Sequence, residues 1–90
     1  MPAGKARTYS IPLKSIYSDE YQLLLRLLVE ARTSANLTQQ EVAIRLVRPQ
    51  SFVSKYERGE RRLDVVEFFR VSRAVGADPY RLLKVLDGKR

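Results

Sequence analysis

The chain has 90 residues, carries 17 basic and 10 acidic side chains for a formal net charge of +7, and contains neither cysteine nor histidine. This length allows one small domain, and the composition excludes disulfides, zinc fingers and histidine-based catalysis. The longest apolar run, LLLRLLV, is far too short to cross a bilayer, and no apolar segment near the N-terminus indicates a secretion signal. The sequence therefore predicts a soluble, cytoplasmic protein without membrane contact.

Residues 1–17 lack helical periodicity and contain two prolines and a glycine, which predicts a flexible basic N-terminal arm. Ser18 is typical of a helix N-cap, and Asp19 and Glu20 follow in the first turn, where acidic side chains are favoured. Apolar residues then recur at helical spacing to about Ser34. The expected inner face of this first helix consists of Tyr21, Leu24, Leu25, Leu28, Arg32 and Ala35.

Two short helices are predicted next. Thr38 and Glu41 have the spacing of a capping box, in which each side chain binds the backbone amide of the other residue. Pro49 is expected at the first position of the second short helix, and Gly59 is expected to adopt the left-handed conformation that ends it. The inward side chains of the two helices are Val42, Ala43, Leu46, Val53 and Tyr56. Five side chains of the second short helix are expected to point outward, namely Gln50, Ser51, Phe52, Ser54 and Lys55.

Two further helices complete the chain. Asp64 is the expected cap of a fourth helix that stops near Gly76, and Asp78 with Pro79 begins a fifth. Their expected core side chains are Val65, Val66, Phe68, Phe69, Val71, Ala74, Leu82, Leu83 and Leu86. No stretch alternates at the period of a strand, so we expect a compact all-α, five-helix bundle. The expected boundaries are 1–17 for the arm, 18–87 for the domain and 88–90 for a basic tail.

Positive charge is concentrated around the second short helix. Between Arg45 and Arg62, six basic residues stand against two acidic ones, a local net charge of +4. A basic excess at one helix end indicates a polyanionic partner better than basic tails do. In addition, Gln can pair bidentately with adenine, and Lys can donate to the acceptors of guanine. An exposed helix that carries Gln50 near its N-terminal end and Lys55 further along therefore suits the edges of DNA bases.

The stretch LTQQEVAIRLVRPQSFVSKYERGERR resembles the Cro/phage-repressor-type helix-turn-helix family, also called the xenobiotic-response-element family. Its specific part is L-T-Q-x-E-x-A-x-x-L followed by Q-S-x-V-S-K-x-E-R-G, and the similarity extends over residues 21–86. The resemblance implies a lambda-repressor-like fold that binds double-stranded DNA through the major groove, with no cofactor and no small-molecule ligand.

The resemblance also implies a set of contact residues. It places Gln39 at a phosphate, and it places Gln50, Ser51 and Lys55 at the bases. It places the loop after the recognition helix near the sugar-phosphate backbone. Other backbone or secondary contacts are expected from Thr38, Arg48, Phe52, Ser54, Arg58, Arg61 and Arg62, although Thr38 is first a helix cap.

Simpler interpretations of these residues remain open. The polar face of the second short helix is also what an ordinary solvated helix would present. The arginines that follow it could instead balance Glu57, Glu60 and Asp64. Lys5 and Arg7 are either solvated linker charge or part of an arm that enters a DNA groove.

The sequence departs from the family pattern at two positions. The turn residue after Leu46 is commonly glycine in this family because it has a positive φ, but here it is Val47, for which that conformation is costly. Either the turn is strained or its geometry differs. The second departure is Pro49, where the family usually has a capping serine or threonine.

Two structural expectations do not depend on DNA. Arg32 and Glu57 lie on the inner stripes of facing helices, which predicts a buried ion pair that fixes how the helices meet. The fourth and fifth helices carry more apolar side chains than their core-facing positions can hold. They either complete the core or form a two-fold dimer contact, for which the candidates are Val65, Phe68, Tyr80 and Val85.

The leading hypothesis is a nucleoid-associated transcription regulator that binds an inverted-repeat operator as a homodimer and acts as a repressor. The alternative is a protein-interaction module, because antitoxins and bridging cofactors use the same fold. Val47 and the apolar Phe52 suit that alternative better. An enzyme is not expected, because no nucleophile has a candidate base beside it.

Overall fold

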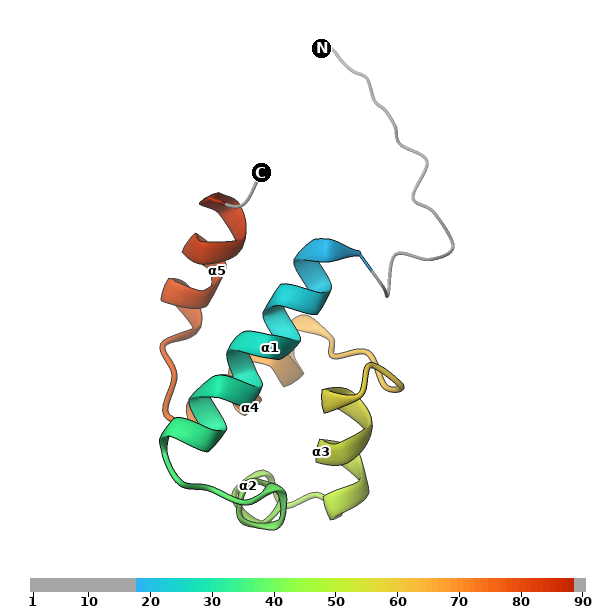
Figure 1. The fold of residues 1–90 in the computed structure, drawn as a ribbon. Coiled ribbons are helices and arrows are strands. Elements are labelled where there is room, and N and C mark those ends of the chain that lie inside the picture. The colour runs from blue at the N-terminus through green and yellow to red at the C-terminus, as the bar shows by residue number, and fades with distance from the viewer. Residues whose placement is uncertain (1–17, 89–90) are drawn as a thin grey trace.

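The computed structural model describes residues 18–88. It contains five helices, and the described part of the chain has no strand, so the all-α, five-helix prediction is confirmed (Figure 1). The helices are α1 (Asp19–Ser34), α2 (Gln39–Leu46), α3 (Gln50–Glu57), α4 (Val65–Ala74) and α5 (Pro79–Gly88). The arm expected at 1–17 and the last two residues of the expected tail lie outside the described residues, and Gly88 belongs to α5.

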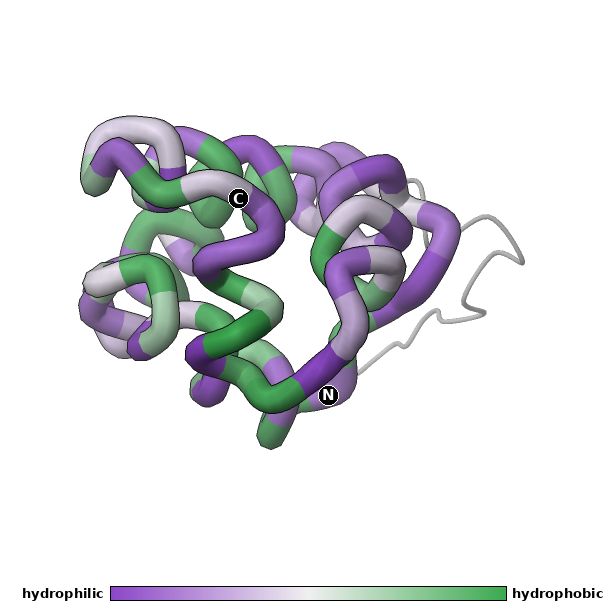
Figure 2. Tube along the Cα trace, turned by 90° about the horizontal axis from the view of Figure 1, so that it is seen from below, coloured by the Kyte–Doolittle hydropathy of each residue, from purple (hydrophilic) through white to green (hydrophobic). Residues whose placement is uncertain are grey.

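The long helix α1 is the centre of the arrangement. It contacts α5 and α3, while α2 contacts both α3 and α4. In Figure 1, α5 and α3 lie on opposite sides of α1, α4 lies behind it, and α2 lies across the lower end. Hydrophobic and hydrophilic segments alternate along the helices (Figure 2), as expected for amphipathic helices around one core. The core side chains include Leu28, Val42, Val53, Tyr56, Val71 and Val75, all at most 2% exposed.

Side-chain caps begin four of the helices at the predicted residues, and that of α5 is Asp78, whose carboxylate accepts a hydrogen bond from the Tyr80 amide at 2.9 Å. The Oγ atom of Ser18 accepts a hydrogen bond from the amide of Tyr21 at 3.2 Å. Thr38 and Glu41 form the predicted capping box. Asp64 caps α4, and it does so as a second capping box with Glu67, which the sequence reading missed. These boundaries were therefore visible in the sequence because each cap is a local interaction.

Four side chains predicted to face the core are instead exposed, namely Ala35, Val65, Val66 and Leu83. In α4 the core face consists of Phe68, Val71 and Ser72. Ser72 is completely buried, and its hydroxyl donates a hydrogen bond to the carbonyl of Phe68 at 2.7 Å, so that its polar group is satisfied. The sequence does not reveal which face of α4 packs inward, because apolar side chains occur around most of the surface of this ten-residue helix.

Two buried tyrosines differ in the environment of their hydroxyl groups. The Tyr21 oxygen accepts a hydrogen bond from the backbone amide of Leu63 at 3.0 Å. The buried Tyr56 hydroxyl has no hydrogen-bond partner among residues 18–88. Burial raises the pKa of Tyr56 far above its ordinary value, because the phenolate would lose its hydration.

The same substitution at these tyrosines is therefore expected to have different effects. Tyr56→Phe should leave the free energy of unfolding unchanged or raise it by up to about 1 kcal/mol, since it removes an unsatisfied polar group. Tyr21→Phe should lower it by about 1–3 kcal/mol, since it leaves the Leu63 amide buried without an acceptor. Urea unfolding of both variants measures the difference, and equal losses would contradict it.

Val47 ends α2 in a left-handed conformation, with φ 56° and ψ 48°. Its amide donates to the carbonyl of Ile44 at 3.1 Å, and the Arg48 amide donates to that of Ala43 at 3.0 Å. The turn thus keeps the positive φ for which glycine is suited, and the strain expected from the sequence is present. The Val47 side chain is 88% exposed, so burial in the described structure does not offset this strain.

Val47→Gly is accordingly expected to stabilise the protein by about 1 kcal/mol. The relief of strain, about 1–3 kcal/mol, exceeds the extra backbone entropy that glycine loses on folding, about 0.5–1 kcal/mol. Thermal unfolding should show a rise in Tm of about 4–8 °C. The matched control is Val66→Gly in α4, where the backbone is helical and the same substitution should lower Tm. A lower Tm for Val47→Gly would show that the left-handed conformation is not strained.

Candidate nucleic-acid interface

The helix α3 has a buried face and an exposed polar face. Val53 and Tyr56 are completely buried, whereas Gln50, Ser51 and Lys55 are exposed. Lys55 forms no ion pair among residues 18–88. The outward face of α3 therefore presents an amide, a hydroxyl and a free ammonium group to solvent, which together can donate to and accept from base edges.

A chain of hydrogen bonds connects this face to the interior. The predicted pair is confirmed: Arg32 Nε donates to Glu57 Oε2 at 2.7 Å and Nη2 donates to Oε1 at 3.1 Å, and the two side chains are 14% and 7% exposed. The hydrogen bond from Arg32 to Glu57 raises the pKa of the guanidinium, against the opposing effect of burial. Arg32 also donates to the carbonyl of Leu37 at 2.9 Å, which fixes the loop before α2.

Gln39 extends this chain to the exposed surface. Its Nε2 donates to Glu57 Oε1 at 2.8 Å, and its Oε1 accepts a hydrogen bond from Gln50 Nε2 at 3.4 Å. The first residue of α2 therefore links the buried ion pair to the first residue of α3. The sequence reading expected Gln39 only at a phosphate and missed this positioning contact, because it depends on how α2 and α3 meet in space.

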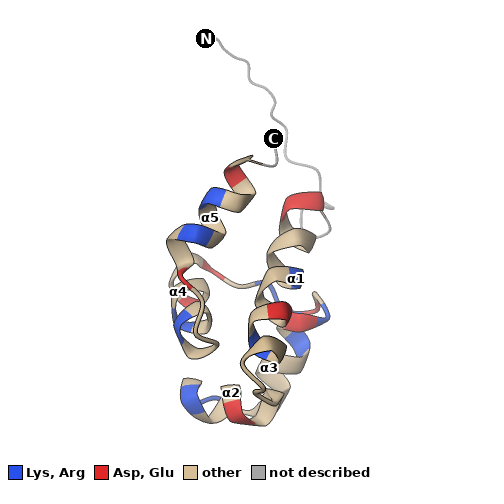
Figure 3. Cartoon of the chain, turned by 60° about the vertical axis from the view of Figure 1, so that its left-hand side comes forward, with Lys and Arg blue, Asp and Glu red and all other residues tan. Residues whose placement is uncertain are grey.

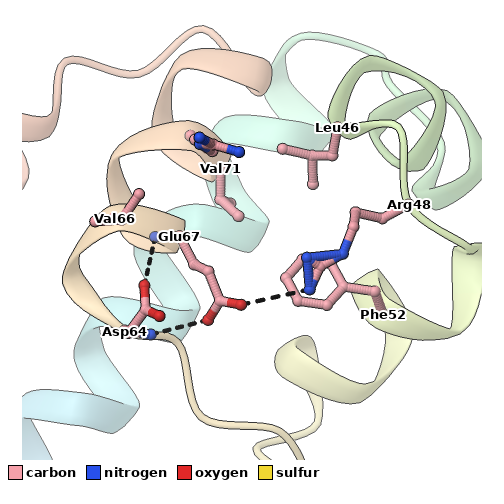
Figure 4. A pocket seen from close by; sticks show the side chains of 8 residues that line it. Leu46, Arg48, Phe52, Asp64, Val66, Glu67 and Val71 are labelled. Atoms are coloured by element: carbon pink, nitrogen blue, oxygen red, sulfur yellow. Dashed lines mark hydrogen bonds and ion pairs between the residues drawn. The ribbon is translucent and has the colours of Figure 1, made fainter.

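The predicted outward placement of Phe52 is wrong. Its side chain is only 9% exposed, and its ring packs edge-to-face against Tyr56 with the centroids 5.5 Å apart. The guanidinium carbon of Arg48 lies 4.1 Å from the ring centroid (Figure 4), and that of Arg61 lies 5.2 Å from it. These cation–π contacts cover the ring with polar groups. Phe52 therefore serves to position two arginines, and it is covered by its own chain.

Two arginines beside α3 share one acidic partner within the protein. Arg61 donates to Glu67 at 2.6 and 3.0 Å, and Arg48 approaches the same carboxylate at 3.4 Å. The hydrogen bonds from Arg61 lower the pKa of Glu67. The sequence reading offered Glu57, Glu60 and Asp64 as the balancing acids and overlooked Glu67, which lies on the next helix.

Two other arginines occupy the loop after α3. Arg58 forms a two-point pair with Glu60, at 2.9 and 3.1 Å, in which both side chains are more than half exposed. Arg62 lies over the ring of Tyr21, with its guanidinium carbon 4.4 Å from the centroid. These arginines are held near the end of α3, and the exposed pair can exchange its carboxylate for a phosphate oxygen at little cost.

Two hydroxyl groups from the predicted set are already engaged. Thr38 Oγ1 accepts the Glu41 amide at 3.0 Å as part of the cap. Ser54 is half-buried and donates to the carbonyl of Ser51 at 3.3 Å. Neither arrangement prevents a further contact, but both show that the first function of these hydroxyls is structural.

The connection between α2 and α3 is the remaining feature of the site. Only residues 47–49 separate the two helices, which contact one another directly, and the left-handed Val47 makes the tight turn. Pro49 occupies the N-cap position of α3 and not its first helical position as predicted. A family model of the helix-turn-helix domain matches residues 23–83, which include this whole arrangement.

The chain belongs to the helix-turn-helix domain family. A solved structure of an "XRE-family like protein from Pseudomonas syringae pv. tomato str. DC3000" is 56% identical to it and superposes with a TM-score of 0.79, covering 84% of this chain and 93% of that chain. Comparison with curated proteins gave no match.

These findings confirm the resemblance to Cro/XRE-type helix-turn-helix proteins, which are DNA-binding transcription regulators. In this helix-turn-helix protein, α2 and α3 are the two helices of the motif, and α3 is the one with the exposed polar face. Within residues 18–88, no helix combines the length and the apolar character that a membrane crossing requires.

Proposed function

We propose that this chain is a sequence-specific repressor that inserts α3 into the major groove of an operator and blocks a promoter by occupying it. The observation that carries the proposal is the chain of contacts from Arg32 through Glu57 and Gln39 to Gln50. A side chain that is positioned before binding loses less conformational entropy on binding. Gln50 is thus suited to bidentate pairing with adenine, and the free Lys55 is suited to guanine.

Backbone contacts would come from the basic loop and the start of α2. Arg58, Arg61 and Arg62 lie directly after α3, and Thr38 lies at the N-terminus of α2, where phosphate oxygens are favoured. Glu60 and Glu67 hold two of these arginines in the free protein. A phosphate would therefore compete with the Glu67 carboxylate for Arg61, whereas the exposed pair of Arg58 and Glu60 would exchange at little cost.

A two-fold dimer would match an inverted-repeat operator, with half-sites about one helical turn apart. Three of the predicted contact residues are available: Val65 is 66% exposed, Tyr80 61% and Val85 47%. Phe68 is not available, because it is 4% exposed and belongs to the core. The Phe69 ring supports Tyr80 in an edge-to-face contact, with centroids 5.6 Å apart. Sedimentation of Tyr80→Glu should therefore show a smaller species than that of the parent protein.

The experiment that tests the function is selection from a random duplex DNA library at ~150 mM salt, where phosphate-only binding is weak. Enrichment of an inverted repeat, with the preference at particular bases relaxed by Gln50→Ala, would support direct reading by α3. The matched control is Gln22→Ala on the exposed side of α1, which should leave the preference unchanged. If nothing is enriched, or if all sequences are bound alike and released alike by salt, the proposal fails.

A further inference from the structure

A second surface, separate from α3, combines positive charge with exposed apolar groups. A hollow of about 500 Å³ lies between the end of α2 and the side of α4. Its lining residues are Arg45, Leu46, Val47, Arg70, Arg73 and Ala74. We call this set the α2–α4 surface. None of its residues belongs to α3, and in Figure 3 the basic segments of α2 and α4 lie on the left while α3 lies on the right.

The charged residues that line the α2–α4 surface are all basic. Its lining contains three arginines and no acidic residue. Arg70 and Arg73 form no side-chain hydrogen bond or ion pair among residues 18–88, and both are exposed. Arg45 donates to the carbonyl of Ala74 at 2.8 Å, so its guanidinium is fixed at the end of α4. This contrasts with the arginines beside α3, which are held by Glu60 and Glu67.

One apolar residue of the α2–α4 surface, Val47, has no role in the core, whereas Leu46 and Ala74 pack against it. Val47 is 88% exposed although it occupies a backbone conformation in which a β-branched residue is strained. Its side chain does not stabilise the described fold by burial. Because burial in the described fold does not offset the strain at Val47, this side chain is the apolar group of the surface that a partner could cover.

We propose that the α2–α4 surface docks an acidic segment of another protein, in which apolar side chains cover Val47 and carboxylates pair with Arg70 and Arg73. Arginine is suited to this because it binds carboxylates in a two-point geometry and also packs on apolar groups. A phosphate backbone would use the arginines and leave the apolar groups uncovered, so a protein segment fits the surface better than nucleic acid does. This inference does not rest on operator binding by α3.

The test uses three synthetic peptides as probes and the full chain labelled with ¹⁵N. One peptide is amphipathic and contains glutamate and leucine, the second contains glutamate and serine, and the third contains lysine and leucine. The glutamate–leucine peptide should shift the amide resonances of residues 44–48 and 70–74. Fluorescence anisotropy should show that it binds at least about tenfold more tightly than either control peptide.

Variants assign the binding to the two components of the surface. Arg70→Glu with Arg73→Glu should weaken binding of the glutamate–leucine peptide at least about tenfold, whereas Arg81→Glu on the exposed side of α5 should not. Val47→Gly should weaken it while leaving the fold intact, since glycine suits the backbone there. The folded state of every variant is checked by circular dichroism and thermal unfolding.

Three outcomes would overturn the proposal. The first is that the peptide shifts other residues or binds the Arg70→Glu/Arg73→Glu variant as well as the parent. The second is that duplex DNA shifts residues 70–74 and that this binding is lost in the charge variants but kept in Val47→Gly, which would assign the surface to phosphate. The third is that the charge variants abolish self-association of the chain, which would assign it to a second copy.

Discussion

Replacing Arg32 by alanine is expected to destabilise the protein by about 3–5 kcal/mol, because it leaves the carboxylate of Glu57 buried without its partner. The Glu57 side chain is only 7% exposed, and after the substitution its remaining side-chain donor would be Gln39. Small domains have total stabilities of about 5–15 kcal/mol. The loss is therefore a large fraction of the total stability, and the variant should unfold at a lower temperature and a lower urea concentration than the parent protein. Urea unfolding followed by circular dichroism measures the effect.

Two further variants distinguish the contribution of the buried pair to stability from the general effect of removing a charge. Arg58→Ala breaks the exposed pair with Glu60 and should change the stability little. Arg32→Met combined with Glu57→Met removes both charges and should recover much of the loss, because a buried pair is often replaced by apolar side chains without net cost. If Arg32→Ala were as stable as Arg58→Ala, Glu57 would not be buried as the structure shows.

Reversing the charge of Lys55 is expected to weaken binding to the selected operator by about a hundredfold, since a carboxylate would then face the bases and phosphates in the groove. Lys55 is exposed on α3 and has no ion pair within residues 18–88, so Lys55→Glu should not affect the fold. Electrophoretic mobility shift at fixed salt measures the change in Kd.

The control for this prediction is Lys84→Glu, an exposed lysine on α5 with the same change of net charge. It should lower the affinity only slightly, because charge far from the DNA is screened by salt. If the two variants were weakened equally, the affinity would depend on net charge alone, and α3 would not be the helix that reads the groove. Loss of helix content in Lys55→Glu would make that variant uninformative, so Lys55→Gln is measured as well. Its operator affinity should fall between those of Lys55→Glu and Lys84→Glu.

Features that depend on a few consecutive residues could be predicted from the sequence. The caps at Ser18, Thr38 and Asp64 and the left-handed Gly59 are of this kind. The Arg32–Glu57 pair could also be predicted, although the residues are far apart in the sequence, because opposite charges on two inner stripes have few other ways to be satisfied.

Features that depend on the relative placement of helices could not be predicted. Phe52 was assigned to the outer face because helical spacing alone does not show that Arg48 and Arg61 close over its ring. Glu67 was overlooked as an ion-pair partner for the same reason, since it approaches Arg61 only when α4 packs beside the loop. Phe68 was a candidate both for the core and for a dimer contact, because the sequence does not show which side of α4 meets the core.

The division of α3 between buried and exposed positions has a consequence for how the protein could acquire a new target. Phe52, Val53 and Tyr56 cannot vary freely without loss of the core, whereas Gln50, Ser51 and Lys55 can take most side chains without affecting it. A library that randomises only these three codons is small enough to be screened exhaustively against any chosen duplex. Substitutions at these positions would change the DNA sequence that is preferred without changing the stability of the fold. Closely similar proteins could therefore come to control different genes while keeping the same fold.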